Sequence, residues 1–287
     1  MTSPPFLTEG LGWRPDLPDP RDYTPEHERI AELLKGLPRV ESMPRAVAWG
    51  DFCPGEIDRG GTATSVACAC VALVQYFERR VQGRAVRPSV QFVHQTARRL
   101  LLARGDGGEE IRTALKAIAR FGIPDAAHWP YDPARLGGDP DAFAFAAARR
   151  YSGLAFVRLD PPGRSGDDVL RTVRSFLAGG FACVFGFPLC SSPADEGDIS
   201  FPTVFDRVCG GQAAVAVGYD DVRRIRSHRG ALRIVNSCGP GWGDCGLGHL
   251  PYLFVRRRLA ADFWTLVRPE WLASGEFRQG LRQPPRI

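Results

Sequence analysis

The 287-residue chain has very little lysine and no long apolar run. Lysine occurs only at Lys35 and Lys116, so arginine supplies almost all of the basic charge behind the formal net charge of +5. No stretch approaches the ~20 apolar residues that a membrane-spanning helix requires. The basic stripe with interleaved aromatic residues that is typical of nucleic-acid binding is also missing. We therefore expect neither a membrane nor a nucleic acid as a partner.

The first six residues, MTSPPF, lack the basic and apolar regions of a secretory signal peptide. Eight cysteines without such a signal fit a reducing compartment better than a disulfide framework. The paired spacings typical of zinc ligands are absent as well. We expect a cytoplasmic protein with no metal and no cofactor. The preference for arginine over lysine, with abundant alanine and glycine, indicates a GC-rich bacterial genome.

Three segments carry the strongest pattern in the chain. Residues 58–67 read DRGGTATSVA, residues 209–219 read CGGQAAVAVGY, and residues 234–246 read IVNSCGPGWGDCG. They resemble, in the same order, the catalytic segments of papain-like cysteine peptidases: D-Q-G-x-x-G-S-C-x-A, G-G-H-A-V-x-x-V-G-Y and N-S-W-G-x-x-W-G-x-x-G. From Ser65 to Gln212 the chain advances 147 residues, within the roughly 130–150 residues that separate a papain-type nucleophile from its histidine.

The resemblance covers roughly residues 10–275, which is too much of the chain for a chance motif match. Four further segments are similar to bacterial members of the family: residues 10–22 (GLGWRPDLPDPRD), 76–80 (YFERR), 128–132 (HWPYD) and 158–163 (RLDPPG). The family resemblance implies an α+β, papain-like two-lobe fold. A helical lobe would pack on a β-barrel-like lobe, with a cleft between them.

The resemblance also implies that both catalytic groups are replaced. Ser65 stands at the position of the nucleophilic cysteine and Gln212 at that of the general-base histidine, while Asn236 is retained. A hydroxyl is harder to deprotonate than a thiol, and a glutamine amide cannot accept a proton at useful pH. Removal of triad members costs on the order of 10⁴–10⁶ in rate. We therefore expect the chain to have lost peptidase activity.

Arg59 occupies the position of the glutamine that stabilises the oxyanion in the family. Its guanidinium can still donate hydrogen bonds, but with a different geometry and a positive charge. The N-terminus of a helix beginning near Thr62 would add to that field. These features predict an acidic ligand near Arg59. The alternative is a structural ion pair with Glu56, Asp58 or another carboxylate.

Four residues are expected to flank the cleft. Cys68 lies one helical turn beyond the nucleophile position, Cys209 lies three residues before the base position, Cys238 replaces the family's first tryptophan after Asn-Ser, and Trp242 follows in the same segment. Unpaired cysteines usually behave as small buried hydrophobes, which is the interpretation we favour. A surrogate nucleophile, a metal site and disulfides remain as alternatives.

No histidine falls at the position of the missing base. The five are His27, His94, His128, His228 and His249. A base needs hydrogen-bond reach to its nucleophile, so we expect these histidines to be surface or structural residues.

Hydrophobic periodicity predicts a helical first half and a strand-rich second half. Helices are expected over residues 30–37, 62–81, 88–104, 107–121 and 167–178, with 141–150 helical or irregular. Strands are expected over 154–159, 182–187, 213–219, 230–236 and 248–252, while 254–261 and the region of Trp264 close the fold. The predicted organisation is an extended N-terminal segment wrapping the fold (1–45), a helical lobe (46–150), a β-rich lobe (151–275) and a C-terminal tail (276–287).

These observations favour a catalytically inactive papain-like pseudopeptidase that acts as a binding, scaffold or regulatory protein. A retained cleft would suit an extended protein or peptide segment. The alternative is a repurposed papain-fold enzyme that performs acyl transfer or cyclisation in a biosynthetic pathway, with the degenerate cleft positioning its substrate.

Overall fold

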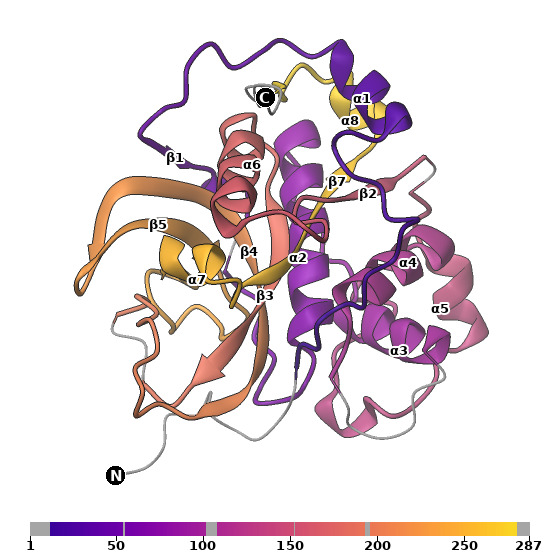
Figure 1. Ribbon diagram of the computed structural model, residues 1–287. Helices are drawn as coiled ribbons and strands as arrows, with labels where there is room; N and C mark the ends of the chain where they lie inside the picture. The colour runs from indigo at the N-terminus through magenta and orange to yellow at the C-terminus, as the bar shows by residue number, and fades with distance from the viewer. Residues whose placement is uncertain (1–11, 54, 102–107, 152, 193–195, 280–287) are drawn as a thin grey trace.

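The computed structural model describes residues 12–53, 55–101, 108–151, 153–192 and 196–279 (Figure 1). The helices are α1 (Glu28–Lys35), α2 (Ser65–Gln82), α3 (Val90–Leu100), α4 (Ile111–Phe121), α5 (Ala142–Ala147), α6 (Gly166–Ala178), α7 (Tyr252–Arg256) and α8 (Pro269–Leu272). The strands are β1 (Ala46–Ala48), β2 (Ala155–Arg158), β3 (Cys183–Cys190), β4 (Val208–Ile225), β5 (His228–Val235), β6 (Leu247–Pro251) and β7 (Ala261–Val267). Short 3₁₀ turns occupy Gly50–Phe52 and Pro133–Arg135.

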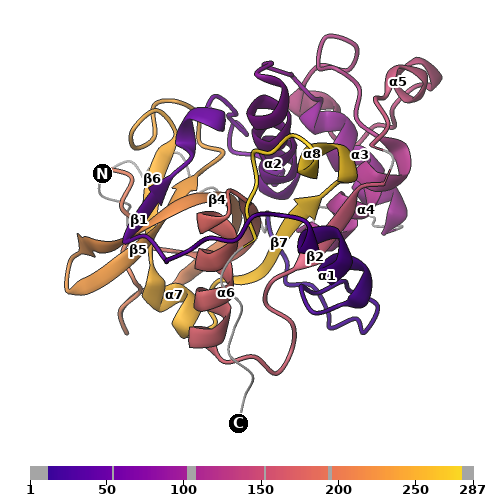
Figure 2. The same cartoon turned by 90° about the horizontal axis from the view of Figure 1, so that it is seen from above.

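Every helix and strand predicted from periodicity is present, within a few residues at most ends. The ends of the helices predicted over 88–104 and 107–121 fall partly outside the described residues, as do the beginning of the N-terminal segment and most of the tail. Figure 2 shows α3, α4 and α5 on one side of α2, and β5 and β6 on the other.

The central helix α2 begins at Ser65 rather than at Thr62 as predicted. Its residues from Ser65 to Val74 are all buried, which fits a sequence of small and apolar side chains. The helix ends at Gly83, whose φ of 64° lies in the left-handed region that glycine adopts without steric cost. The Gly83 N–H donates to the carbonyl of Arg79 and so closes the last turn.

The strands form one antiparallel sheet in the order β2-β7-β3-β4-β5-β6, and β1 pairs with β4. The predicted α+β class is confirmed. Within the described residues this strand path does not return on itself, so the lobe expected to be barrel-like is an open sheet.

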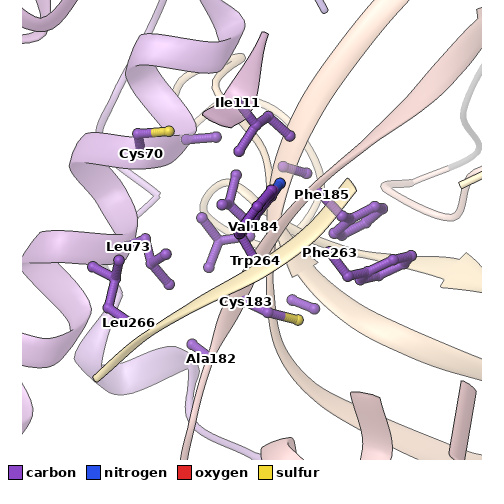
Figure 3. Packing of buried hydrophobic residues seen from close by; sticks show 14 of the residues in the cluster. Cys70, Leu73, Ile111, Ala182, Cys183, Val184, Phe185, Phe263, Trp264 and Leu266 are labelled. Carbon is purple, nitrogen blue, oxygen red and sulfur yellow. The ribbon is translucent and has the colours of Figure 1, made fainter. Parts of the chain in front are cut away.

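The core fills the space between α2 and the sheet. In Figure 3, Cys70 and Leu73 lie between α2 and the strands β3 and β7, which contribute Val184 and Trp264. On the opposite side of these strands Phe185 stacks on another aromatic ring, that of Phe263, with ring centroids 4.8 Å apart. Strands β3 and β7 are therefore buried on both faces.

The N-terminal segment is attached to this core by a buried cluster of charged side chains. Arg112 of α4 donates to both carboxylate oxygens of Asp22, at 2.8 and 2.7 Å. Arg158 of β2 donates to Asp262 of β7 at 2.7 Å, and the backbone N–H of Asp16 donates to the same carboxylate at 2.8 Å. Residues 12–22 are thereby fixed between the two halves of the molecule.

Candidate functional site

Ser65, Gln212 and Asn236 come together from three different elements. Ser65 is the first residue of α2, Gln212 lies in β4, and Asn236 directly follows β5. The backbone N–H of Ala213 donates to the Ser65 hydroxyl at 3.3 Å and joins α2 to β4. All three predicted site residues are buried, with 6% or less of each exposed.

Arg59 is brought to the same place by backbone pairing. Its N–H donates to the carbonyl of Ser237 at 3.0 Å, and Asp58 forms an isolated antiparallel bridge with Cys238. The Arg59 guanidinium donates to the carbonyl of Thr62 at 2.6 Å, just before α2 begins. The loop that carries Arg59 therefore connects the start of α2 to the segment after β5.

The Gln212 side chain makes the contact that orients an imidazole in the family. Its Nε2 donates to Asn236 Oδ1 at 2.6 Å and to Ser237 Oγ at 3.3 Å. The Ser237 N–H donates to the same Asn236 oxygen at 2.9 Å, which identifies that atom as the acceptor and fixes the orientation of both amides. Within the described chain, Gln212 Oε1 is buried without a hydrogen-bond partner. An amide held in this way orients neighbouring groups but cannot accept the Ser65 proton.

The histidines make their contacts elsewhere. His27 accepts from the Arg29 N–H at the start of α1, and His94 forms a buried pair with Glu109. The rings of His128 and His228 lie edge-on to those of Phe143 and Phe201, respectively. His249 is 3.0 Å from the carboxylate of Asp198. None of these contacts involves Ser65.

The cysteines near the site are poor nucleophiles. Burial raises the pKa of Cys68 to about 12, and its Sγ lies 3.7 Å from the Thr64 hydroxyl. Burial also raises the pKa of Cys238. Because the thiolate is the reactive form of cysteine, neither side chain suits the role of surrogate nucleophile at neutral pH.

On one side the cleft is filled by the chain's own N-terminal segment. The Glu109 N–H donates to the Gly12 carbonyl at 3.3 Å, and the Trp13 N–H donates to the Gly211 carbonyl at 3.1 Å. The backbone passes so close to Ser65 that a Cβ added at Gly12 would lie 2.4 Å from the hydroxyl oxygen. In Figure 1 this indigo segment begins beside the first turn of α2 and crosses towards α1.

Trp13 holds that segment in place. Its indole packs directly over Gly186, where an added Cβ would lie 2.0 Å from the ring, and its Nε1 donates to Asp262 at 3.1 Å. The sequence patterns did not predict that Gly12 and Trp13 enter the site. The available signal was the GLGWRPD sequence, because glycine allows close backbone approach and tryptophan seeks a buried site with an acceptor.

A pocket adjoins Gln212 and Asn236. Its cavity volume is small, about 40 Å³, and the space of about 530 Å³ around it includes open solvent. Its polar wall holds Arg59, Gln212, Asn236, Ser192 and Ser200, and the remaining lining comes from Pro188, Leu189, Cys190, Ile199, Cys238, Trp242 and Phe254. Among the residues predicted to form or flank the site, Arg59, Gln212, Asn236, Cys238 and Trp242 share this pocket. Ser65, Cys68 and Cys209 lie outside its lining among the described residues.

The described residues contain no group of three or more histidine, cysteine, aspartate or glutamate side chains that is arranged to hold a metal ion. None of their helices combines the length and apolarity needed to cross a bilayer.

Comparison with known proteins places this geometry in a wider context. No protein-family model matches the chain. It is 28% identical over 247 residues to an uncharacterized peptidase C1-like protein of Acanthamoeba polyphaga mimivirus. The match covers 83% of this chain and 75% of that protein.

Among solved structures the chain is similar to xylellain, a cysteine protease from Xylella fastidiosa. The TM-score is 0.71 with 26% identity, over 91% of this chain and 97% of that one. Digestive procathepsin L 3 of the Tenebrio molitor larval midgut matches with a TM-score of 0.60 and 17% identity, over 90% of this chain and 76% of that one. These likenesses show a papain-like fold and support a relationship to the papain-like, C1-like cysteine peptidases.

Proposed function

We propose that this papain-fold chain is a pseudopeptidase, which binds a ligand or a protein segment and does not cleave peptides. The observation that carries the proposal is the amide pair at the position of the base. Gln212 donates to Asn236 Oδ1 at 2.6 Å, where an active enzyme needs a protonatable ring. Among the residues that the structure describes, the buried Ser65 hydroxyl accepts from the Ala213 N–H and makes no hydrogen bond to a histidine or a carboxylate that could remove its proton.

The described residues close the cleft beside Ser65 and leave a pocket beside Gln212. The side next to Ser65 is closed by Gly12 and Trp13, so a peptide could reach the hydroxyl only by displacing them. The pocket beside Gln212 has an opening, an apolar wall and a few polar groups, which is the usual composition of a ligand site. We therefore place the ligand there.

The chemistry of the pocket favours a ligand with an acidic group and an apolar body. Arg59 contributes a guanidinium, and Leu189, Ile199 and Phe254 contribute apolar surface. A carboxylate or phosphate oxygen near Arg59 would accept charge-assisted hydrogen bonds, which contribute roughly 1.5–3 kcal/mol each when well formed.

The first test is of peptidase chemistry. Wild-type protein is expected to cleave no member of a broad peptide library, and to react with neither a fluorophosphonate nor an epoxide probe, because Ser65 has no base. Labelling of Ser65 or of a cysteine that disappears when that residue is mutated would overturn the proposal.

A variant that restores the family residues is the positive control for this assay. Ser65→Cys with Gln212→His changes little volume, so we expect the free energy of unfolding to stay within about 1.5 kcal/mol of wild type. Its epoxide labelling should be slow because Gly12 covers position 65. Adding Gly12→Ala should accelerate labelling, since the new methyl group pushes the N-terminal segment away.

The second test is of the ligand class. Thermal-shift and calorimetric titration with small carboxylates, inorganic phosphate and acidic peptides should show stabilisation of wild type that Arg59→Gln weakens at least tenfold in Kd. The exposed Arg257 offers a matched control, and Arg257→Gln should leave binding unchanged. Equal binding by wild type and Arg59→Gln would reduce Arg59 to a structural residue.

A further inference from the structure

Two cysteines lie on opposite strands at the end of the β3–β4 pair, where Cys190 also lines the pocket beside Gln212. Leu189 pairs with Gly210, and the next residue, Cys190, pairs with Val208. The register therefore skips Cys209, which is the extra residue of a β-bulge opposite Cys190.

From this register we expect the two thiols to be able to reach each other. Residues opposite each other in an antiparallel pair have Cα atoms about 4.5–5.5 Å apart, and a disulfide requires about 4.4–6.8 Å. At the bulge, two residues of β4, Val208 and Cys209, oppose the single residue Cys190 of β3. Cys209 therefore lies across from Cys190.

The pair also differs from most other cysteines in its access to solvent. Cys190 and Cys209 are half-buried, whereas Cys53, Cys68 and Cys70 are buried. Burial raises the pKa of Cys190, and the nearby Asp206 and Cys209 groups raise it further. Both thiols are partly open to solvent, so an oxidant can reach the pair.

We propose that Cys190 and Cys209 form a reversible disulfide when the protein is exposed to a peroxide. The Cys209 thiol loses two electrons to the O–O bond, and the products are a sulfenic acid and water. The Cys190 sulfur then attacks the sulfenic sulfur, the S–S bond forms, and the hydroxyl group leaves as a second water with the thiol proton. The net change is two thiols and one hydrogen peroxide to one disulfide and two waters.

The disulfide would fix the base of the loop between β3 and β4. The described part of that loop is already held by the Asp206 carboxylate, which accepts from Ser192 Oγ at 2.5 Å and from Thr203 N at 2.8 Å. The loop carries Val204 and Phe205, whose side chains are 93% and 91% exposed. Because Cys190 also lines the pocket next to Gln212, oxidation would link the state of this loop to the wall of the pocket.

The test is disulfide mapping of the native full-length chain. After treatment with one equivalent of hydrogen peroxide, non-reducing digestion and mass spectrometry should recover a peptide pair joined through Cys190 and Cys209, lighter by two hydrogen atoms. Dithiothreitol should separate the pair. The link should be absent from Cys190→Ser and from Cys209→Ser, and retained in Cys245→Ser, which removes an exposed cysteine.

Two outcomes would overturn the inference. One is that both thiols survive peroxide that already oxidises Cys245. The other is that the native chain gives the same mixture of cysteine pairs as the chain oxidised in denaturant, because selective pairing must come from the folded register. A glutathione redox titration of wild type and Cys245→Ser should give a single shared midpoint for the Cys190–Cys209 link.

Discussion

Replacing Arg158 with alanine is expected to lower the free energy of unfolding by about 3–5 kcal/mol. The Arg158 guanidinium lies 2.7 Å from Asp262, 3.2 Å from Asp160 and 3.4 Å from Asp22. Each of these four side chains is at most 8% exposed. Loss of the shared cation leaves carboxylates uncompensated in a low-dielectric interior, which is why the expected effect is large. Urea denaturation of wild type and variant measures it.

A surface pair on the same N-terminal segment is the control. Arg21 lies 2.7 Å from Asp19, but the Arg21 side chain is 84% exposed. Exposed ion pairs contribute little, so Arg21→Ala should leave the urea midpoint unchanged within error. Arg158→Lys should recover only part of the loss, because one ammonium cannot serve three carboxylates as a planar guanidinium does. If Arg158→Ala and Arg21→Ala had equal midpoints, the cluster would not stabilise the fold.

The main helices were predictable from local signals. The apolar positions from Val66 to Phe77 indicated α2, and Gly122 and Gly179 marked where α4 and α6 end. These signals lie within a few residues of the structure that they determine, so they can be recognised along the chain.

Strand β7 was missed, and the reason is its environment. Ala261–Val267 lies between β2 and β3, and six of its seven residues are buried. A strand covered on both faces lacks the alternation that reveals a half-exposed strand. Aspartate is also unfavourable in a strand by propensity, and the burial of Asp262 depends on distant donors: the Arg158 guanidinium, the Trp13 indole and the Asp16 N–H.

The candidate site was likewise predictable only in part. The positions of Ser65, Gln212 and Asn236 could be inferred because three short motifs kept their order and spacing, and the structure brings them together. The filling of the cleft could not, because it depends on hydrogen bonds of Gly12 and Trp13 to residues far away in sequence. Such backbone contacts between distant segments leave no periodic pattern in the sequence.

The second large effect is a dependence of stability on pH that centres on Asp16. Its carboxylate accepts from Trp264 Nε1 at 2.9 Å and lies near Asp262, Arg112 and Arg158. Burial and the charge of Asp262 raise the pKa of Asp16 from 3.8 to about 7, although the hydrogen bond and both arginines oppose that shift. Burial and the charge of a neighbouring carboxylate likewise raise the pKa of Asp262 to about 6.

The direction of the effect follows from these shifts. Between about pH 4 and pH 7 the folded protein holds a proton that the unfolded chain has released, so stability falls as the pH rises. The contribution is complete below the ordinary carboxyl pKa and is lost once the pH passes about 7. With 1.36 kcal/mol for each unit of pKa, the loss between about pH 5 and pH 8 is on the order of 2 kcal/mol.

Asp16→Asn should remove most of this slope. Asparagine stays uncharged at every pH, and its Oδ1 can still accept from Trp264 Nε1. Urea midpoints at pH 5 and pH 8 should therefore differ less in the variant than in wild type. A residual slope should remain, since burial also raises the pKa of Asp160.

Asp19→Asn is the control. In wild type, hydrogen bonds from Arg21 hold the pKa of the Asp19 carboxyl well below its usual range, so this group stays ionised between pH 5 and pH 8. The variant should therefore keep the wild-type slope. Equal slopes in wild type and Asp16→Asn would instead mean that Asp16 is ionised in the folded protein at pH 5, and that Arg112 and Arg158 outweigh the cost of its burial.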